Sequence, residues 1–157
     1  MNERKAVRSV FLTSDGRILL MKIEEPVTGY QFWITPGGGI EPGESAKEGL
    51  RREVEEETGV KAIQIGPVIW TREHAFTWDG RAYRQEEAYY LVETECFEPE
   101  MDEEAAPGEW SAFRGFHWWS VEEIKNSEET FVPRNLYILL KGLIENGPPE
   151  EPLKVGI

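Results

Sequence analysis

The segment from Arg52 to Glu57 places four carboxylates within six residues, and this crowding constrains the chain more than any other feature. Residues three and four apart share one face of a helix, so Glu53, Glu56 and Glu57 converge if the segment is helical. Carboxylates held this close repel one another unless a cation lies between them. Because Mg²⁺ and other hard divalent ions prefer oxygen ligands, the cluster predicts a metal site.

The same helix has a predicted buried stripe, and one of the acids falls inside it. At about 100° per residue, the stripe is formed by Ala46, Leu50 and Val54. Glu57 falls within this stripe and Glu56 on its edge, whereas Glu48 and Glu55 face away. A solvated acidic face is the common explanation for a run of charges. It suits Glu48 and Glu55 but does not suit Glu57, so we favour the metal site.

Both ends of the helix are marked in the sequence. Ser45 followed by Glu48 forms a capping box, and Gly59 suits the position just after the last turn, so the helix is expected over residues 46–58. The preceding segment 36–44 is rich in glycine, which lets backbone approach a ligand or metal closely. It matches neither the phosphate-binding P-loop nor the dinucleotide fingerprint. Taken alone, these glycines indicate no more than a turn.

The glycine segment and the helix together carry a much more specific pattern. From Gly38 to Val60 the chain reads GGIEPGESAKEGLRREVEEETGV. This stretch resembles the signature box of the Nudix hydrolases at every fixed position. The segments flanking the box also resemble that family, both at residues 33–38 (WITPGG) and at residues 118–124 (WWSVEEI).

The resemblance implies a fold, an activity and a site. The fold is expected to be α/β, an α/β/α sandwich on a mixed sheet, with the domain over residues 1–146 and an extended tail over 147–157. The activity is expected to be hydrolysis of a diphosphate linkage in a nucleoside diphosphate derivative by water, with Mg²⁺ or alternatively Mn²⁺. The rivals are a nucleotide-binding sensor without turnover and, ranked last, an acidic domain with an incidental Ca²⁺ site.

The resemblance also assigns roles within the box. Glu53, Glu56 and Glu57 match the metal-binding acids, and the Gly38 carbonyl matches a backbone oxygen that joins the metal shell. Arg52 matches the arginine that orients a catalytic glutamate. The catalytic group is therefore expected to be Arg52, Glu53, Glu56 and Glu57. Glu44 matches the acid that supports Arg52. The box does not identify the general base or the substrate, which could be a nucleoside di- or triphosphate, a nucleotide sugar or a dinucleoside polyphosphate.

Composition limits the class of protein further. The length suits one domain, and no apolar run is long enough to cross a membrane. The only cysteine, Cys96, excludes an internal disulfide, is expected to be a small buried side chain, and fits a cytoplasmic location. The net charge of −13 argues against a nucleic-acid partner and implies that bound cations offset the charge of a nucleotide substrate. A homodimer is possible, since many relatives are dimers.

Outside the box, the sequence predicts two hairpins and two helices. Strands are expected over 6–13 and 17–23, joined by a turn at 14–16, and over 68–78 and 81–93, joined at 79–80. The second hairpin would pair Phe76 with Tyr83, Arg72 with Glu87, and Glu73 with Glu86. Ser120 with Glu123 predicts a short helix to residue 126, and Pro133 a helix to residue 145.

These strands supply the remaining candidates. Glu87 is our choice for an accessory metal ligand, with an ion pair to Arg72 or plain solvation on the strand as the nearly even alternative. Glu86, Glu103 and Glu104 are other acids, the last two expected to be solvated. Phe76 and Tyr83 could stack on a nucleobase, although cross-strand packing is commoner. Arg72, Arg81 and Arg84 are the nearest cations for substrate phosphates, although plain solvation is the commoner role for each one alone, and Arg72 is the one we select.

Overall fold

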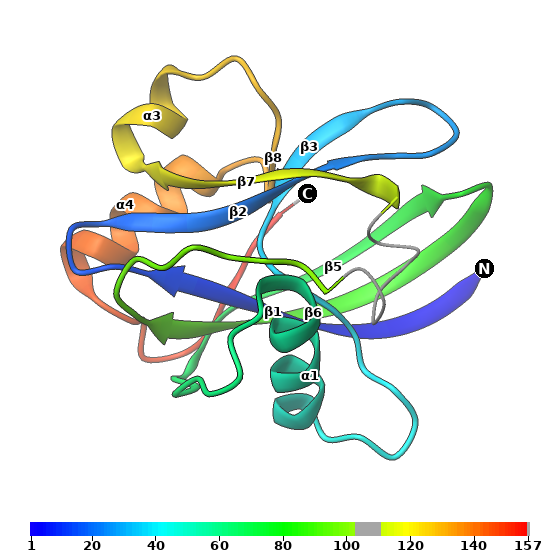
Figure 1. The fold of residues 1–157 in the computed structure, drawn as a ribbon, viewed down its shortest axis with the longest axis horizontal. Helices are drawn as coiled ribbons and strands as arrows, with labels where there is room; N and C mark the ends of the chain where they lie inside the picture. The colour runs from blue at the N-terminus through cyan, green and yellow to red at the C-terminus, as the bar shows by residue number, and fades with distance from the viewer. Residues whose placement is uncertain (103–110, 157) are drawn as a thin grey trace.

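The computed structural model describes residues 1–102 and 111–156. The strands are β1 (Asn2–Leu12), β2 (Arg17–Glu24), β3 (Gln31–Ile34), β4 (Gly37–Gly39), β5 (Val68–Trp78), β6 (Arg81–Glu93), β7 (Phe113–Ser120), β8 (Phe131–Val132) and β9 (Leu153–Lys154). The helices are α1 (Ala46–Thr58), α3 (Val121–Asn126) and α4 (Leu136–Asn146). The strands form one mixed sheet, and the α/β class is confirmed (Figure 1).

Strand β1 organises the sheet. It pairs in parallel with β6 along its whole length, from Asn2 opposite Tyr83 to Leu12 opposite Glu93. On its other side it pairs with the glycine strand β4 over Ala6–Arg8, and with β2 at Leu12. The sheet order is β8-β3-β2-β1-β6-β5-β9, with β7 paired to β2. This arrangement brings the glycine segment beside the middle of the sheet.

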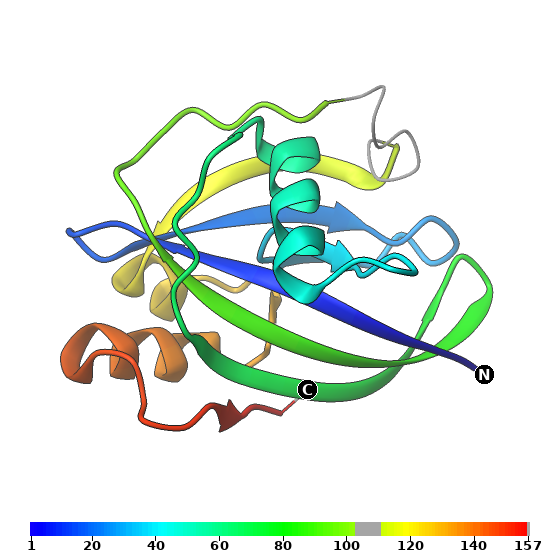
Figure 2. The ribbon, with the colours of Figure 1, turned by 90° about the horizontal axis from the view of Figure 1, so that it is seen from below.

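Helices cover both faces of the sheet, as the sandwich prediction requires (Figure 2). Helix α1 packs Leu50 and Val54 against a cluster that includes Val7, Phe11 and Tyr90. On the opposite face α3 and α4 cover a larger cluster with Ile124, Leu136, Leu140 and Leu143. Because α1 is anchored by its apolar stripe, the acids interleaved with that stripe are held against the sheet.

The features that depend on residues close together in the sequence, namely helix ends and the hairpin register, are confirmed. Helix α1 has the predicted bounds, with the Ser45–Glu48 capping box and Gly59 at φ 80°. The β5–β6 register is the predicted one, with Phe76 opposite Tyr83 and Glu73 opposite Glu86. Its turn has positive φ at Asp79 (49°) and Gly80 (78°), as a two-residue hairpin of the I′ type requires. Helix α3 begins at the second capping box.

Other features differ from the predictions. Strand β1 begins at Asn2 instead of Ala6, because β6 offers it partners along that length. Helix α4 begins at Leu136, whose amide donates to the Pro133 carbonyl in a preceding turn. The extended tail returns to the sheet as β9, parallel to β5, and buries Val155. Cys96 is exposed instead of buried.

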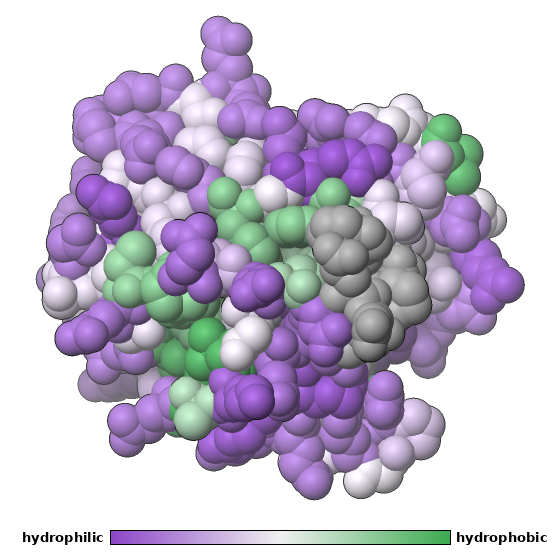
Figure 3. Space-filling model, in the orientation of Figure 1, coloured by the Kyte–Doolittle hydropathy of each residue, from purple (hydrophilic) through white to green (hydrophobic). Residues whose placement is uncertain are grey.

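The surface over α1 is hydrophilic, in keeping with the acids that face solvent there, whereas apolar residues show beside the helix (Figure 3). In the described residues no helix is long and apolar enough to span a membrane.

Candidate active site

The acids of α1 adopt the arrangement that the helical wheel predicts. Glu53 and Glu57 are 5% and 4% exposed, Glu56 is half-buried and Glu55 is exposed. Partial burial of these carboxylates has an electrostatic cost at Glu56. Burial, and then the charge of Glu53, raise the pKa of the Glu56 carboxyl. A bound cation would offset this cost because it favours the ionised form.

Arg52 joins the acids to the loop before the helix. Its guanidinium bonds both carboxylate oxygens of Glu44, at 2.8 Å and 3.0 Å. The same hydrogen bonds lower the pKa of Glu44 to about 2. Arg52 Nη2 also donates to the Gly39 carbonyl at 3.1 Å. The predicted support of Arg52 by Glu44 is therefore present as a bidentate pair, which fixes the plane of the guanidinium.

The glycine strand β4 lies directly against the acids. The Gly37 amide donates to Glu57 Oε1 at 2.6 Å. A Cβ built on Gly38 would lie 2.6 Å from the Glu53 carboxyl carbon, so only glycine leaves room there for the carboxylate. These contacts bring the Gly38 backbone, Glu53 and Glu57 together, at residues for which the sequence predicts a metal site. They also give a physical reason for glycine in this part of the box.

The residues fit a divalent cation, although the side chains would have to adjust. Glu53 Oε2 is buried and, among the described residues, has no hydrogen-bond partner, which an oxygen-binding cation would supply. Among the residues that the structure describes, no three acidic, histidine or cysteine side chains lie close enough together to hold a metal ion. Arg52 Nη1 instead lies between Glu53 at 2.9 Å and Glu56 at 3.5 Å.

Glu87 forms the ion pair that was the alternative to metal binding. It is 3% exposed, and its oxygens accept from Arg72 Nη1 at 2.7 Å and Arg8 Nε at 2.8 Å. His74 Nε2 lies 3.1 Å away. Burial alone would raise the pKa of Glu87, but Arg8, His74 and Arg72 outweigh it and hold the pKa well below its usual range. With both oxygens engaged by cations, Glu87 is a poor metal ligand, and our first choice for it is corrected.

Arg72 is likewise unsuited to the phosphate-binding role that we predicted. Its side chain is 4% exposed, and beyond Glu87 it donates to the Gly156 carbonyl at 3.1 Å. Its guanidinium is used to anchor the tail and to neutralise Glu87. Of the other two strand arginines, Arg84 pairs with Glu73 at 3.2 Å and thereby offsets the opposed charges of Glu73 and Glu86.

Sequence reasoning missed Arg8, which links the Glu87 pair to the site. Arg8 Nη1 donates to the carbonyls of Thr35 and Gly37, at 3.3 Å and 3.2 Å. Glu87 therefore holds Arg8, and Arg8 in turn holds the backbone at Thr35 and Gly37. This backbone carries the Gly37 amide that binds Glu57, and it leads directly into the Gly38 carbonyl. A single arginine between the apolar residues Val7 and Val10 was the available signal, but its partners are distant in sequence.

The predicted aromatic pair is present at the free end of the β5–β6 hairpin. Phe76 and Tyr83 stack with centroids 5.3 Å apart, and His74 stacks on Phe76 at 4.9 Å. Both rings are half-buried, so they pack on each other and still offer an edge to solvent. Glu103 and Glu104, the other acids considered, lie outside the described residues.

A hollow of about 710 Å³ opens beside the acids, and it contains cations that the sequence analysis did not select. Glu53, Glu44 and Gly39 line it together with Arg4 and Lys5. Successive strand residues point to opposite faces, so Arg4 and Lys5 place positive charge on both sides of the β1 edge. The hollow beside the acids is therefore lined by positive as well as negative side chains.

Comparisons with known proteins agree with this geometry. A family model described as the NUDIX domain matches residues 2–140. The nucleoside triphosphatase NudI of Salmonella agona is 32% identical over 137 residues, 85% of this chain and 93% of that protein. The RNA pyrophosphohydrolase of Rhodopseudomonas palustris is 30% identical over 117 residues, 69% of this chain and 68% of that protein.

Solved structures have the same fold. The MutT protein from Methanosarcina mazei superposes with a TM-score of 0.64 at 21% identity, covering 89% of this chain and 94% of that chain. The dihydroneopterin triphosphate pyrophosphohydrolase of E. coli gives 0.63 at 14% identity, covering 93% and 99%.

Proposed function

Since this chain belongs to the NUDIX family, we propose that it is a nucleotide pyrophosphohydrolase. It hydrolyses a diphosphate linkage in a nucleoside diphosphate derivative by attack of water on phosphorus. The observation that carries the proposal is the convergence of Glu53, Glu57 and the Gly38 backbone beside an Arg52 held by Glu44. Two relatives named as a triphosphatase and a pyrophosphohydrolase support it. Neither the site nor the relatives favour a sensor without turnover.

Hydrolases of this family generally use divalent metals, and we propose Mg²⁺ here, with Mn²⁺ as the alternative. Glu53, Glu56, Glu57 and the Gly38 carbonyl would hold it. A bound divalent ion polarises phosphoryl oxygens and lowers the pKa of bound water. The buried, unpartnered oxygen of Glu53 is the observation that supports a cation at this place.

The chain's own residues supply positioning and proton transfer. Arg52 keeps Glu53 and Glu56 oriented, because Glu44 fixes its guanidinium from the other side. Glu56 is the half-buried acid that Arg52 Nη1 contacts at 3.5 Å, and we infer that it accepts the proton from water. Lys5 and Arg4 offset the charge of the substrate's phosphates in the hollow beside the acids. Phe76 and Tyr83 offer an aromatic edge for the nucleobase.

Replacement of Glu56 by Gln tests the proposal. The variant keeps the shape of the side chain and removes its charge, so turnover of nucleotide substrates should fall at least about 10²-fold. Phosphate release should be measured across a panel of nucleotides with Mg²⁺, with Mn²⁺ and with chelator. Glu55→Gln is the matched control, because Glu55 is exposed on the same helix. Near-normal activity of Glu56→Gln, or equal losses in both variants, would contradict the assignment.

A further inference from the structure

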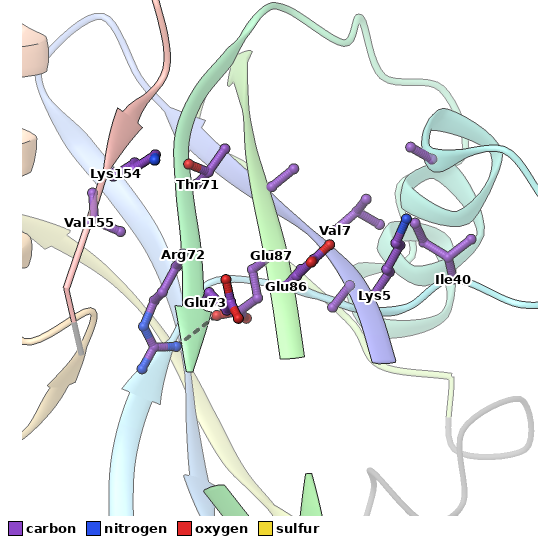
Figure 4. Close-up of a pocket in the computed structure, with 13 residues that line it drawn as sticks. Lys5, Val7, Ile40, Thr71, Arg72, Glu73, Glu86, Glu87, Lys154 and Val155 are labelled. Carbon is purple, nitrogen blue, oxygen red and sulfur yellow. Dashed lines mark hydrogen bonds and ion pairs between the residues drawn. The ribbon is translucent and has the colours of Figure 1, made fainter. Parts of the chain in front are cut away.

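A second pocket, of about 530 Å³, lies over the sheet between the start of α1 and the tail strand β9 (Figure 4). Its volume is in the range of small-molecule sites. One wall is formed by Lys154 and Val155, which lie outside residues 2–140, the part of the chain that the family model matches. The pocket is therefore partly built by a segment beyond the family-matched domain.

The pocket has an apolar floor and a charged rim. Val7 and Ala88, on strands of the sheet, form the floor, and Ile40 lies at the side next to α1. Lys5 and Lys154 lie on opposite sides with acids between them. In the described part of the chain, no ion pair or side-chain hydrogen bond engages Lys5, Glu86 or Lys154. The rim thus presents both donors and acceptors that a ligand could use.

The pocket adjoins the hollow beside the catalytic acids. Lys5 and Ile40 line both, so the two meet at this point. Neighbouring strands lie about 4.8 Å apart, so Lys5 and Lys154, on strands three steps apart, are separated by about 14 Å perpendicular to the strands. Along the strands they are offset, because Lys154 lies opposite Thr71 and Lys5 is level with Glu73. A substrate with a phosphate near Glu53 could extend past Lys5 toward Lys154.

We propose that this pocket holds the group bonded to the substrate's diphosphate, and that this group is polyhydroxylated, such as a sugar. Glu86 accepts hydrogen bonds from its hydroxyls, Lys154 donates to them, and Lys5 contacts the phosphate at the junction. The apolar floor packs against the C–H face of the ring. This inference rests on the proposed function and names the substrate class of the same site.

The composition of the pocket favours a sugar over the other groups that nucleotides carry. Among its described lining residues there is no aromatic ring, so a nucleobase would find nothing to stack on. A purely anionic group would meet the carboxylates of Glu73 and Glu86. A polyhydroxylated group uses acids and lysines together, because each hydroxyl both donates and accepts.

Hydrolysis kinetics with matched substrates test the proposal. UDP-glucose and ADP-ribose should be compared with UTP and ATP, in the protein as it stands and in Glu86→Gln and Lys154→Met. Loss of a hydrogen bond to a charged group should raise KM for the sugar nucleotides about tenfold or more, with kcat and the triphosphate kinetics unchanged. Lys61→Met, another exposed lysine, is the control. Equal effects on both substrate classes, or no effect on either, would overturn the proposal.

A binding measurement separates failure of the inference from failure of the proposed function. Calorimetric titration in the presence of chelator compares UDP-glucose with UDP. Tighter binding of UDP-glucose that is lost in Glu86→Gln supports the sugar pocket even without turnover, whereas equal binding of the two nucleotides overturns it. Absence of metal-dependent turnover on every substrate would instead reject the hydrolase.

Discussion

Replacement of Glu87 by Gln should strongly destabilise the fold. The side chain of Glu87 is fully buried, and its carboxylate is shared by Arg8 and Arg72 at 2.8 Å and 2.7 Å. Glutamine preserves the shape of the side chain but leaves the buried guanidinium of Arg72 and the partly buried one of Arg8 without their counter-charge. Removing one partner of a buried pair costs about 3–5 kcal/mol, a large fraction of the 5–15 kcal/mol that typically stabilises a domain.

The predicted loss can be measured as a shift in melting temperature. A domain of this size changes by about 2–4 °C per kcal/mol, so the Tm of Glu87→Gln should fall by about 6–20 °C at pH 7. Circular dichroism melts and urea titrations give two independent readings. Glu93→Gln, exposed on the same strand, should stay within about 0.5 kcal/mol of the parent protein. A Tm drop below about 2 °C in Glu87→Gln would refute the reasoning.

The pH dependence of this difference has a definite sign. The folded pKa of Glu87 lies below its unfolded value, so its contribution to stability is fully present above that unfolded value. The gap in Tm between parent and variant should therefore stay constant near neutrality and shrink only as the pH falls below about 4.3. A gap that grows on acidification would contradict the ion-pair account.

Three further predictions concern the site and the surface. Gly38→Ala should lower kcat about 10²-fold, because its Cβ would displace the Glu53 carboxylate; activity near that of the parent would contradict the close approach. In a carboxyl NMR titration, Glu44 should titrate near pH 2 and lose its pair with Arg52 only there, whereas a midpoint near 4 would disprove the bidentate pair. Cys96 should react with a thiol reagent in the native protein about as fast as after denaturation, since it is exposed; protection of more than about tenfold would indicate burial.

Much of the site could be predicted because it is coded locally. The bounds of α1 follow from Ser45, Glu48 and Gly59, and the burial of Glu57 follows from the helical repeat. The β5–β6 register follows from its two-residue turn. Each of these features depends on residues close together in the chain. Short-range geometry was therefore sufficient to predict them.

Sequence reasoning could find only one of the two arginines that bind Glu87. The predicted register placed Arg72 opposite Glu87, and that pair is present. The ion pair of Arg8 with Glu87 joins residues 79 positions apart, and it depends on the parallel pairing of β1 with β6, which no local pattern encodes. Without Arg8, the choice between metal ligand and ion pair could not be made.

The sequence by itself determined the family signature, the acidic face of α1 and the turns, because periodicity and capping act within a few residues. Only the tertiary structure decided the partners of buried charges and the return of the tail as β9, which supplies a wall of the second pocket. It also decided the exposure of Cys96. These outcomes depend on which distant segments pack together, and long-range packing is a property of the whole chain.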